Sequence, residues 1–249
     1  MDKTLLKGLM LLEALADQNG KPVTIPVLAE QVGLTKSNTH RTLQTLAHAG
    51  YATRDDTTGN YRSTFKLFEL GAKQMAQIDV RQFAAVHMRA LVELTQETVH
   101  LSILDGGSVV YVDKIESAQP VRAYSVLGGH APAYCVATGK ILLAHQTQEF
   151  LARHLTDLTA YTKATITDFP ALKIELARAA TNGYAINRGE WRESVGGVAA
   201  PIFDAFGLPT AAIGISGPLE RLSVKRMKEF APAVQDAALN ISRAMGFRK

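Results

Sequence analysis

Two short runs of helical periodicity, divided by one glycine and followed by a hairpin pattern, constrain this sequence more than any other feature. Residues 24–64 read TIPVLAEQVGLTKSNTHRTLQTLAHAGYATRDDTTGNYRST. Thr24 is a suitable helix N-cap, Leu28 and Val32 repeat at helical spacing, and Gly33 permits a tight turn. This pattern predicts a compact helix-turn-helix unit that carries a β-hairpin wing.

The second helix of this motif is expected to begin after Thr35, which can cap it. Spacing places Thr39, Leu43 and Leu46 on its inner face. The outer face then holds a polar and basic set, which consists of Lys36, Ser37, Asn38, His40, Arg41 and Gln44. Such side chains hydrogen-bond base edges and neutralise phosphates, so this face is the predicted DNA-reading surface. A solvated face of a small helical bundle is the plain alternative.

The hairpin pattern favours the DNA interpretation. Two short runs alternate like strands on either side of a turn that contains Gly59. Arg54 and Arg62 are expected on facing strands, where they can hold a DNA backbone from two sides. Between Thr35 and Lys66, five lysines and arginines stand against two aspartates, so the local net charge is 5 − 2 = +3. A local excess of this kind is expected of a DNA-contacting segment.

The composition describes an ordinary soluble globular protein. With 249 residues, 47% hydrophobic and 20% charged, the chain suits one large domain or two modest ones. A net charge of +4 is a mild basic bias and by itself weak support for DNA. The single Cys135 excludes an internal disulfide and suits a reducing cytoplasm. No membrane-length apolar run or signal-peptide pattern is present, so we expect a cytoplasmic protein.

Beyond residue 65 the pattern changes to a connector and then to a larger domain. The periodicity predicts a DNA-binding domain at residues 1–65, a linker helix at residues 66–80 and an α+β domain at residues 81–249. A helical connector transmits orientation between domains, whereas a Gly/Ser tether would not.

Within the larger domain, a helix over residues 81–95 is expected to bury Phe83, Val86, Leu91 and Leu94. Further helices are expected at residues 136–145, 149–155 and 170–180, with a last one capped by Ser223. Alternating apolar patterns predict strands near residues 100–104, 109–113, 121–126, 184–188, 198–202 and 210–216.

The segment LTKSNTHRTLQTLAHAGYATRDDTTGNYRSTFKLFELG resembles the DNA-binding segment of IclR-type transcriptional regulators. The resemblance continues in order through APAYCVATGKILLA, GYAINRGEW and GGVAAPIFDAFGLPTAAIGISGP. It implies a winged helix-turn-helix, a helical linker and a C-terminal effector-binding domain with a GAF-like α/β fold. It also implies double-stranded operator DNA as a partner, a homodimer or dimer of dimers, and control of catabolic genes. Thr39 is a departure, because an apolar residue is common there.

The resemblance further implies a site for a small organic-acid effector. The positions that match Ala137 and Thr138 offer backbone amides, and free amides at a helix N-terminus attract an anion. A tight helix start in the core is the alternative. The other implied pocket positions are Asn187, Gly197, Gly214 and Ser216.

Two pocket positions differ from common family residues and bear on the effector. In the family, an acid is frequent at the position of Asn187 and a cysteine at that of Gly197. This chain therefore has no negative charge at residue 187 that would repel an anion, and no side chain at residue 197 that would take up room in the pocket. We therefore expect an effector larger than a two- or three-carbon keto acid, namely an aromatic or dicarboxylic acid. Trp191 and Arg192 can stack on and pair with such a ligand, with an exposed or interfacial role as the alternative.

Catalysis and cofactors have little support. The ATGK at residues 137–140 lacks the earlier glycine and the following Ser or Thr of a phosphate-binding loop. Cys135 precedes an apolar helix, where a buried small residue is more usual than a nucleophile, even with His130 nearby. We expect no catalytic residues, no metal and no cofactor. A sensor that acts through protein partners, or a residual enzyme, is the alternative to a DNA-binding regulator. Arg122 and Arg188 are expected on solvated faces.

Overall fold

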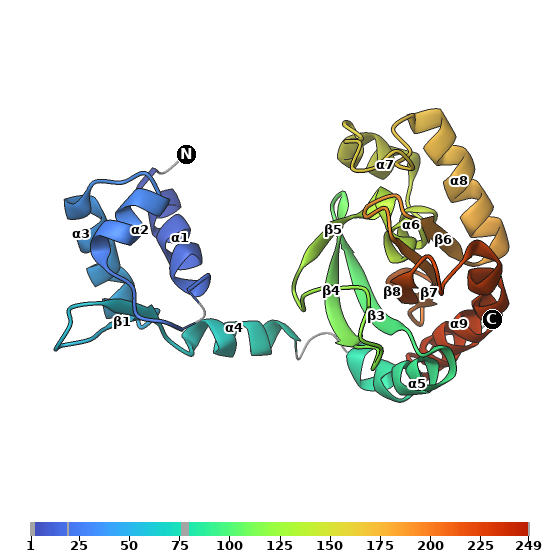
Figure 1. Cartoon of the computed structure of the whole chain (residues 1–249), viewed down its shortest axis with the longest axis horizontal. Coiled ribbons are helices and arrows are strands. Elements are labelled where there is room, and N and C mark those ends of the chain that lie inside the picture. Colours follow the sequence, from blue (N-terminus) through green and yellow to red (C-terminus); the bar gives the residue numbers. More distant parts are fainter. Residues whose placement is uncertain (1–2, 19, 76–79, 249) are drawn as a thin grey trace. The chain divides into compact units, whose positions relative to one another are not determined.

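The computed structural model describes residues 3–18, 20–75 and 80–248. The chain divides into two compact units, residues 1–77 and residues 78–249 (Figure 1). Within the described ranges, no helix is both long and apolar enough to cross a lipid bilayer.

Among its described residues, the first unit begins with three helices and a two-stranded antiparallel ribbon, which precede the connector helix. These are α1 (Lys3–Ala16), α2 (Ile25–Gln31), α3 (Lys36–His48), β1 (Ala52–Arg54) and β2 (Tyr61–Ser63). Their common core includes Leu11, Leu15, Leu28, Leu43 and Tyr61. The predicted helix-turn-helix with a wing is confirmed. The hydroxyl of Thr35 accepts a hydrogen bond from the backbone amide of Asn38 at 3.3 Å, as expected of an N-cap.

The connector begins with a helix that is anchored to the end of α3. This helix is α4 (Lys66–Met75). The ammonium group of Lys66 donates to the carbonyl oxygen of Ala49 at 2.5 Å and lies 4.5 Å from the ring centre of Tyr51. The hydroxyl of Thr64 donates to the carbonyl oxygen of Gly50 at 2.6 Å. These contacts fix the direction in which the connector leaves α3. The predicted extension through residues 76–79, and with it the expected domain boundary, lies outside the described residues.

The second unit is built on one six-stranded antiparallel sheet with the order β5-β4-β3-β8-β7-β6. The strands are β3 (Thr98–Asp105), β4 (Ser108–Ile115), β5 (His130–Pro132), β6 (Ala185–Arg188), β7 (Val195–Phe203) and β8 (Pro209–Pro218). The β3–β4 and β7–β8 hairpins meet at the centre, where Leu101 lies opposite Ile213. Two segments far apart in sequence therefore form one continuous sheet.

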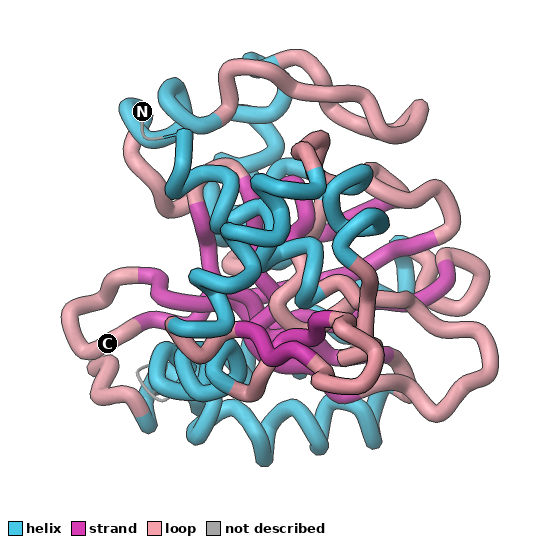
Figure 2. Tube along the Cα trace, turned by 90° about the vertical axis from the view of Figure 1, so that its left-hand side faces the viewer, coloured by secondary structure: helices cyan, strands magenta, loops and turns pink. Residues whose placement is uncertain are grey.

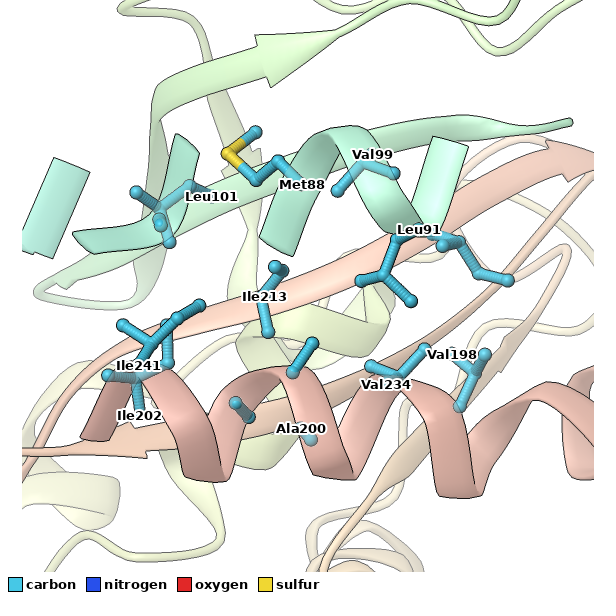
Figure 3. Close-up of a cluster of buried hydrophobic side chains, with 14 of the residues drawn as sticks. Met88, Leu91, Val99, Leu101, Val198, Ala200, Ile202, Ile213, Val234 and Ile241 are labelled. Carbon is cyan, nitrogen blue, oxygen red and sulfur yellow. The ribbon is translucent and has the colours of Figure 1, made fainter. Parts of the chain in front are cut away.

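Helices cover both faces of this sheet (Figure 1, Figure 2). One face carries α5 (Val80–Thr95) and α9 (Val224–Ala244), and side chains such as Met88 and Val234 pack there against Leu101 and Ile213 (Figure 3). The other face carries η1 (Ala133–Cys135), α6 (Ala137–Leu143), α7 (Gln148–His154) and α8 (Phe169–Asn182). Because both faces are covered, both sides of the central strands are buried, including the side of β3 that carries the polar Thr98, His100 and Ser102. The predicted α+β class is confirmed.

The expected inner face of α5 is wrong. Phe83, Val86 and Leu94 are 38%, 64% and 59% exposed, and only Leu91 of the predicted set is buried. The buried stripe consists of Val80, Ala84, Met88, Leu91 and Thr95. Both stripes have apolar residues at helical spacing, so only the packing against the sheet and α9 decides between them.

The strand expected over residues 121–126 is also wrong, because this segment has no regular secondary structure. Its carbonyl groups are bonded by side chains instead of a ladder: Lys114 donates to the carbonyl oxygen of Ser125 at 2.6 Å, and Arg221 to that of Val121 at 2.9 Å. The edge strand next to β4 is β5, which pairs Ala131 with Val109.

The buried hydroxyl of Thr39 provides a test of packing in the first unit. It is fully buried and has no hydrogen-bond partner among the described residues. We predict that Thr39→Val raises the free energy of unfolding of this unit by about 1–2 kcal/mol, because an unpaired buried hydroxyl is replaced by a methyl group. Hydrogen exchange of the α3 amides in the full chain measures this. In the control Thr42→Val, the hydroxyl that donates to the Asn38 carbonyl oxygen is lost, and no gain is expected. Equal gains in the free energy of unfolding for Thr39→Val and Thr42→Val would contradict the conclusion that the unpaired hydroxyl of Thr39 destabilises the first unit.

Candidate functional site

The outer face of α3 presents the six side chains predicted to read DNA. Lys36, Ser37, Arg41 and Gln44 are exposed, and Asn38 and His40 are half-buried. The opposite face is held by Thr39 and Leu43, which are fully buried. The helix therefore offers donors and positive charge on the side away from its core, as entry into a major groove requires.

The register of the wing places its two arginines on facing strands, as expected. Arg54 pairs with Tyr61 across the ribbon, and Arg62 pairs with Thr53. Since directly opposed residues share a face, the two arginines lie on opposite faces of the ribbon. Both are exposed. They can still contact DNA, but not as a pair on one face.

In the second unit, one cavity of about 50 Å³ gathers all of the positions expected to bind an effector. It lies between the start of α6 and the neighbouring strands β3, β6, β7 and β8. Those positions are Ala137, Thr138, Asn187, Trp191, Arg192, Gly197, Gly214 and Ser216. Residues up to 79 positions apart in the sequence are thus brought to one wall.

The start of α6 supplies anion-binding groups to this cavity. The N-cap residue is Val136, which has no side-chain group to bond the first amides of the helix. Ala137 and Thr138 follow it and line the cavity, so their backbone amides have no partner within the helix. Gly139 is required by packing, since a Cβ atom there would collide with the backbone of Ala133. Gly139, the glycine of the ATGK sequence, thus allows α6 to pack closely against η1.

A buried histidine forms part of the same cavity, and no sequence pattern had indicated it. The Nε2 atom of His100 lies 2.7 Å from the hydroxyl of Ser125, and its Nδ1 atom lies 3.1 Å from the hydroxyl of Ser216. Burial, with a smaller contribution from the charge of Lys114, lowers the pKa of His100 to about 4. The ring of Tyr111 lies 4.8 Å away. At neutral pH the imidazole is therefore uncharged and bonded at both nitrogens.

The structure modifies the expectations for Asn187 and Gly197. The side-chain oxygen of Asn187 accepts from the backbone amide of Glu190 at 3.0 Å, and its amide donates to the carbonyl oxygen of Val195 at 3.4 Å. Asn187 thereby holds the turn that carries Trp191 and also lines the cavity. The extra room expected at Gly197 is absent, because a Cβ atom there would lie 2.8 Å from the carbonyl oxygen of Ile215. Close approach of strands requires this glycine.

Trp191 and Arg192 provide a ring and a positive charge at the same cavity. The guanidinium carbon of Arg192 lies 4.7 Å from the ring centre of Trp191, so one cation already stacks on the indole. Trp191 is half-buried and Arg192 is exposed. Burial raises the pKa of Tyr111 to about 12, while the charge of Arg192 opposes that shift.

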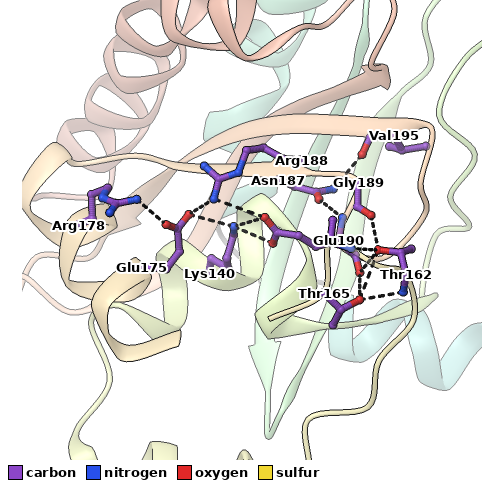
Figure 4. A network of polar contacts seen from close by, with 11 residues as sticks. Lys140, Thr162, Thr165, Glu175, Arg178, Asn187, Arg188, Gly189, Glu190 and Val195 are labelled. Atoms are coloured by element: carbon purple, nitrogen blue, oxygen red, sulfur yellow. Dashed lines mark hydrogen bonds and ion pairs between the residues drawn. The ribbon is translucent and has the colours of Figure 1, made fainter. Parts of the chain in front are cut away.

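Directly behind the start of α6 lies a network of charged residues (Figure 4). Lys140 is fully buried, and its ammonium nitrogen lies 2.7 Å from a carboxylate oxygen of Glu190 and 3.3 Å from one of Glu175. Arg188 adds a contact of 3.0 Å to Glu175, and its side chain is 39% exposed. Burial raises the pKa of Glu175, but the charges of Lys140 and Arg188 outweigh this and the net direction is downward. Lys140 is therefore an ion-pair residue and not a phosphate ligand.

The possible nucleophile pair is not assembled. Cys135 is fully buried, and burial raises the pKa of its thiol to about 12. His130 is exposed on β5. Among the described residues, no group of three or more His, Cys, Asp or Glu side chains is placed to hold a metal ion.

Comparison with known proteins agrees with this architecture. The IclR helix-turn-helix domain matches residues 4–56, and the bacterial transcriptional regulator IclR C-terminal domain matches residues 72–243. The HTH-type transcriptional regulator KdgR of Escherichia coli K12 is 36% identical over 98% of this chain and 93% of its own length. The Thermotoga maritima IclR structure has a TM-score of 0.81 at 31% identity, covering 98% and 99% of the two chains. An IclR homolog from Microbacterium hydrocarbonoxydans, complexed with 4-hydroxybenzoate, has a TM-score of 0.84 at 24% identity and similar coverage, 98% and 99%.

A winged helix-turn-helix joined to an α/β effector domain defines a DNA-binding transcriptional regulator. This chain belongs to the IclR family of transcriptional regulators. Members of this family are not enzymes, which agrees with the buried Cys135.

The ion network predicts a strong dependence of stability on Lys140. Lys140→Met is expected to lower the free energy of unfolding of the second unit by about 3–5 kcal/mol, because Glu190 stays buried without its closest cation and Glu175 keeps only its arginine partners. Urea unfolding of the full chain, followed by a probe in the second unit, measures this. The matched control Lys173→Met removes an exposed lysine of α8 and is expected to change stability by less than about 0.5 kcal/mol. Similar effects of the two substitutions would contradict the role of the network.

Proposed function

We propose that this protein is a dimeric regulator of catabolic genes whose affinity for operator DNA is set by a small organic acid bound in the second unit. The observation that carries the proposal is the cavity lined both by Arg192 and by the first two residues of α6, Ala137 and Thr138, whose amides have no partner within the helix. Backbone amides at a helix N-terminus and a guanidinium group both favour a carboxylate.

An aromatic or dicarboxylic acid is the proposed effector class. Asn187 is uncharged, so it does not repel an anion, and Trp191 offers a ring surface beside the amides. The structural relative complexed with 4-hydroxybenzoate supports an aromatic acid as one candidate. Gly197 does not enlarge the cavity for such a ligand, because the close approach of the neighbouring strand fills the space beside it. Calorimetry with aromatic acids, dicarboxylic acids, glyoxylate and pyruvate tests the effector class. If only glyoxylate and pyruvate bind, the proposal of an aromatic or dicarboxylic acid is refuted.

Exposed apolar side chains on the first unit support a dimer. Leu6, Leu9 and Met10 are 40%, 49% and 38% exposed on α1, and Phe65 and Phe68 are 83% and 73% exposed at and near the start of α4. Large apolar side chains exposed to water on α1 and α4 favour burial against another chain. A second copy satisfies this need and gives two α3 helices for a palindromic operator. Sedimentation of the full chain tests the dimer.

The DNA-reading role of α3 predicts a selective effect of Arg41→Ala. Loss of its guanidinium group is expected to weaken binding to the operator by about 1–3 kcal/mol, since an arginine that contacts a base contributes this much. The operator is the sequence that the unmodified protein selects from a random-sequence library, and fluorescence anisotropy measures the affinity.

Two controls accompany this prediction. Arg153→Ala removes an exposed arginine of α7 and is expected to leave DNA affinity unchanged. Acid binding by Arg41→Ala is also expected to be unchanged, because Arg41 lies in the first unit. Unaltered operator affinity in Arg41→Ala would remove this residue from the DNA-reading surface.

The anion-binding role of α6 predicts that Ala137→Pro weakens acid binding. Proline is tolerated at the first position of a helix, and the extended backbone of Val136 suits a residue before proline. The substitution removes one amide donor, so affinity for the acid is expected to fall by about 1.5–3 kcal/mol, the contribution of a hydrogen bond to a charged group. Calorimetry measures this, with Ala137→Gly, which keeps the amide, as the control. Equal losses in both variants would show that the amide is not the ligand.

A further inference from the structure

A second cavity of the second unit borders the ion network of Lys140, and basic side chains line it. This cavity has a volume of about 360 Å³ and lies between α8, β6 and α9. None of the described residues that line it also lines the cavity at the start of α6. We propose that it binds the phosphate group of a small phosphate ester, and that this anion acts on the ion network through Arg188. The ester site is independent of the acid proposed for the α6 cavity.

Three cations from three different elements line this second cavity. They are Arg178 of α8, Arg188 of β6 and Lys228 of α9. Arg178 and Lys228 are exposed and Arg188 is half-buried, so a ligand from solution can reach all three. Positive charge that comes from three elements can meet an anion from several sides.

The acidic group of this cavity is already neutralised. Glu175 is the only acidic residue among the described residues that line the cavity, and both of its carboxylate oxygens are bonded (Figure 4). One oxygen lies 3.3 Å from the ammonium nitrogen of Lys140 and 3.0 Å from a nitrogen of Arg188. The other accepts a hydrogen bond from Arg178 at 3.0 Å. The negative charge of Glu175 is therefore matched by cations before a ligand arrives.

The charges of the network and the cavity do not balance. Four cations stand against two carboxylates, so the net charge is 4 − 2 = +2. These residues are Lys140, Arg178, Arg188, Lys228, Glu175 and Glu190. The phosphate group of a monoester carries a charge of about −1.5 to −2 at pH 7. One such group neutralises most or all of this excess, whereas one carboxylate neutralises half of it.

The side chains of the cavity can donate several hydrogen bonds to such a group. Among the described residues, Arg178 and Arg188 each donate one hydrogen bond, both to Glu175, so each guanidinium group keeps N–H groups for a ligand. Asn182 and Tyr184 line the same cavity and can donate as well. A phosphate group presents three acceptor oxygens, which the planar fork of arginine matches. The volume lies within the range of about 300–1,000 Å³ that is usual for small-molecule sites.

Arg188 connects this cavity to the buried lysine. A nitrogen of its guanidinium group lies 3.0 Å from Glu175 and 3.8 Å from Glu190, and Glu190 lies 2.7 Å from Lys140. A phosphate that accepts from Arg188 competes with these carboxylates, so their contacts with Lys140 adjust. Trp191 follows Glu190 and is the only tryptophan of the chain, so its fluorescence reports this adjustment.

Calorimetry on the full chain tests the site with phosphate esters and their matched parent compounds. The pairs are glycerol 3-phosphate with glycerol, ribose 5-phosphate with ribose, and phenyl phosphate with phenol, and inorganic phosphate is measured beside them. At least one ester is expected to bind with one molecule per chain and to change the fluorescence of Trp191, while its parent compound does not bind. That ester is expected to bind more tightly than inorganic phosphate, because the cavity also contacts its organic part.

Two variants and one control place the ester in this cavity. Lys228→Gln is expected to weaken ester binding by about two- to fivefold, since an exposed ion pair contributes this much. The double variant of Arg178→Gln and Lys228→Gln is expected to weaken it at least about tenfold. Glu175 keeps Lys140 and Arg188 in that variant, so the fold is expected to persist. The control Lys225→Gln removes another exposed lysine of α9 that does not line the cavity, and ester binding is expected to stay unchanged.

Three results would show that no ester site exists here. Absence of binding by all three esters contradicts the site outright. Inorganic phosphate that binds as tightly as every ester assigns the cavity to free phosphate instead. If the double variant keeps ester binding and Ala137→Pro loses it, the phosphate lies in the α6 cavity. Failure of the acid site is recognised separately, because it appears in calorimetry with the organic acids.

Two further results separate the remaining claims. If the double variant loses salt-dependent affinity for DNA but keeps ester binding, the basic surface is a DNA contact and the ester site is wrong. If an ester binds, depends on Lys228 and leaves the fluorescence of Trp191 unchanged, the action of the anion on the ion network through Arg188 is wrong.

Discussion

Lys140 carries a positive charge where no water reaches it, and two carboxylates from separate segments come to it. Glu175 arrives from α8 and Glu190 from the turn after β6, at 3.3 Å and 2.7 Å. Separating these charges would leave Lys140 buried without a partner and Glu190 without its closest one, so the three segments hold one another in place. Because Lys140 lies one turn beyond Ala137, the network also fixes the helix start that faces the cavity.

The same turn connects the network to the far side of the cavity. The backbone amide of Glu190 donates to Asn187, and the next two residues are Trp191 and Arg192. One set of contacts therefore positions the helix amides on one wall and the guanidinium group on another. The ion pairs behind the cavity therefore help to hold two of its walls in place.

Sequence periodicity predicted the parts of the fold that local interactions decide. The Thr35 cap, the α3 inner face and the hairpin around Gly59 depend on neighbours within a few residues. On α5 the same reasoning failed, since Phe83 and Ala84 both begin apolar stripes and only distant contacts choose between them. Residues 121–126 failed for a similar reason, because side chains of Lys114 and Arg221 bond their carbonyl groups in place of a neighbouring strand.

The candidate site was predictable only where a family resemblance supplied positions. Asn187 faces Gly197 and Gly197 faces Ser216 across the sheet, pairings that no local pattern contains. His100 lies opposite Gly214 in a register that joins the two halves of the second unit. The partners of Lys140 lie 35 and 50 residues away. Such contacts are set by topology, so single-sequence reasoning had no access to them.

The size of these interactions is sufficient for regulation. A ligand shifts DNA affinity only by the difference between its affinities for the two arrangements of the protein. A tenfold change in operator binding needs a difference of about 1.4 kcal/mol, and one hydrogen bond to a carboxylate contributes about 1.5–3 kcal/mol. A single α6 amide that bonds the proposed effector in only one arrangement of the protein would therefore suffice. The turn at Asn187 and the ion pairs of Lys140 hold the walls of the cavity rigid. A small displacement of a rigid wall breaks the hydrogen bond to the ligand, because the wall cannot relax to keep that bond.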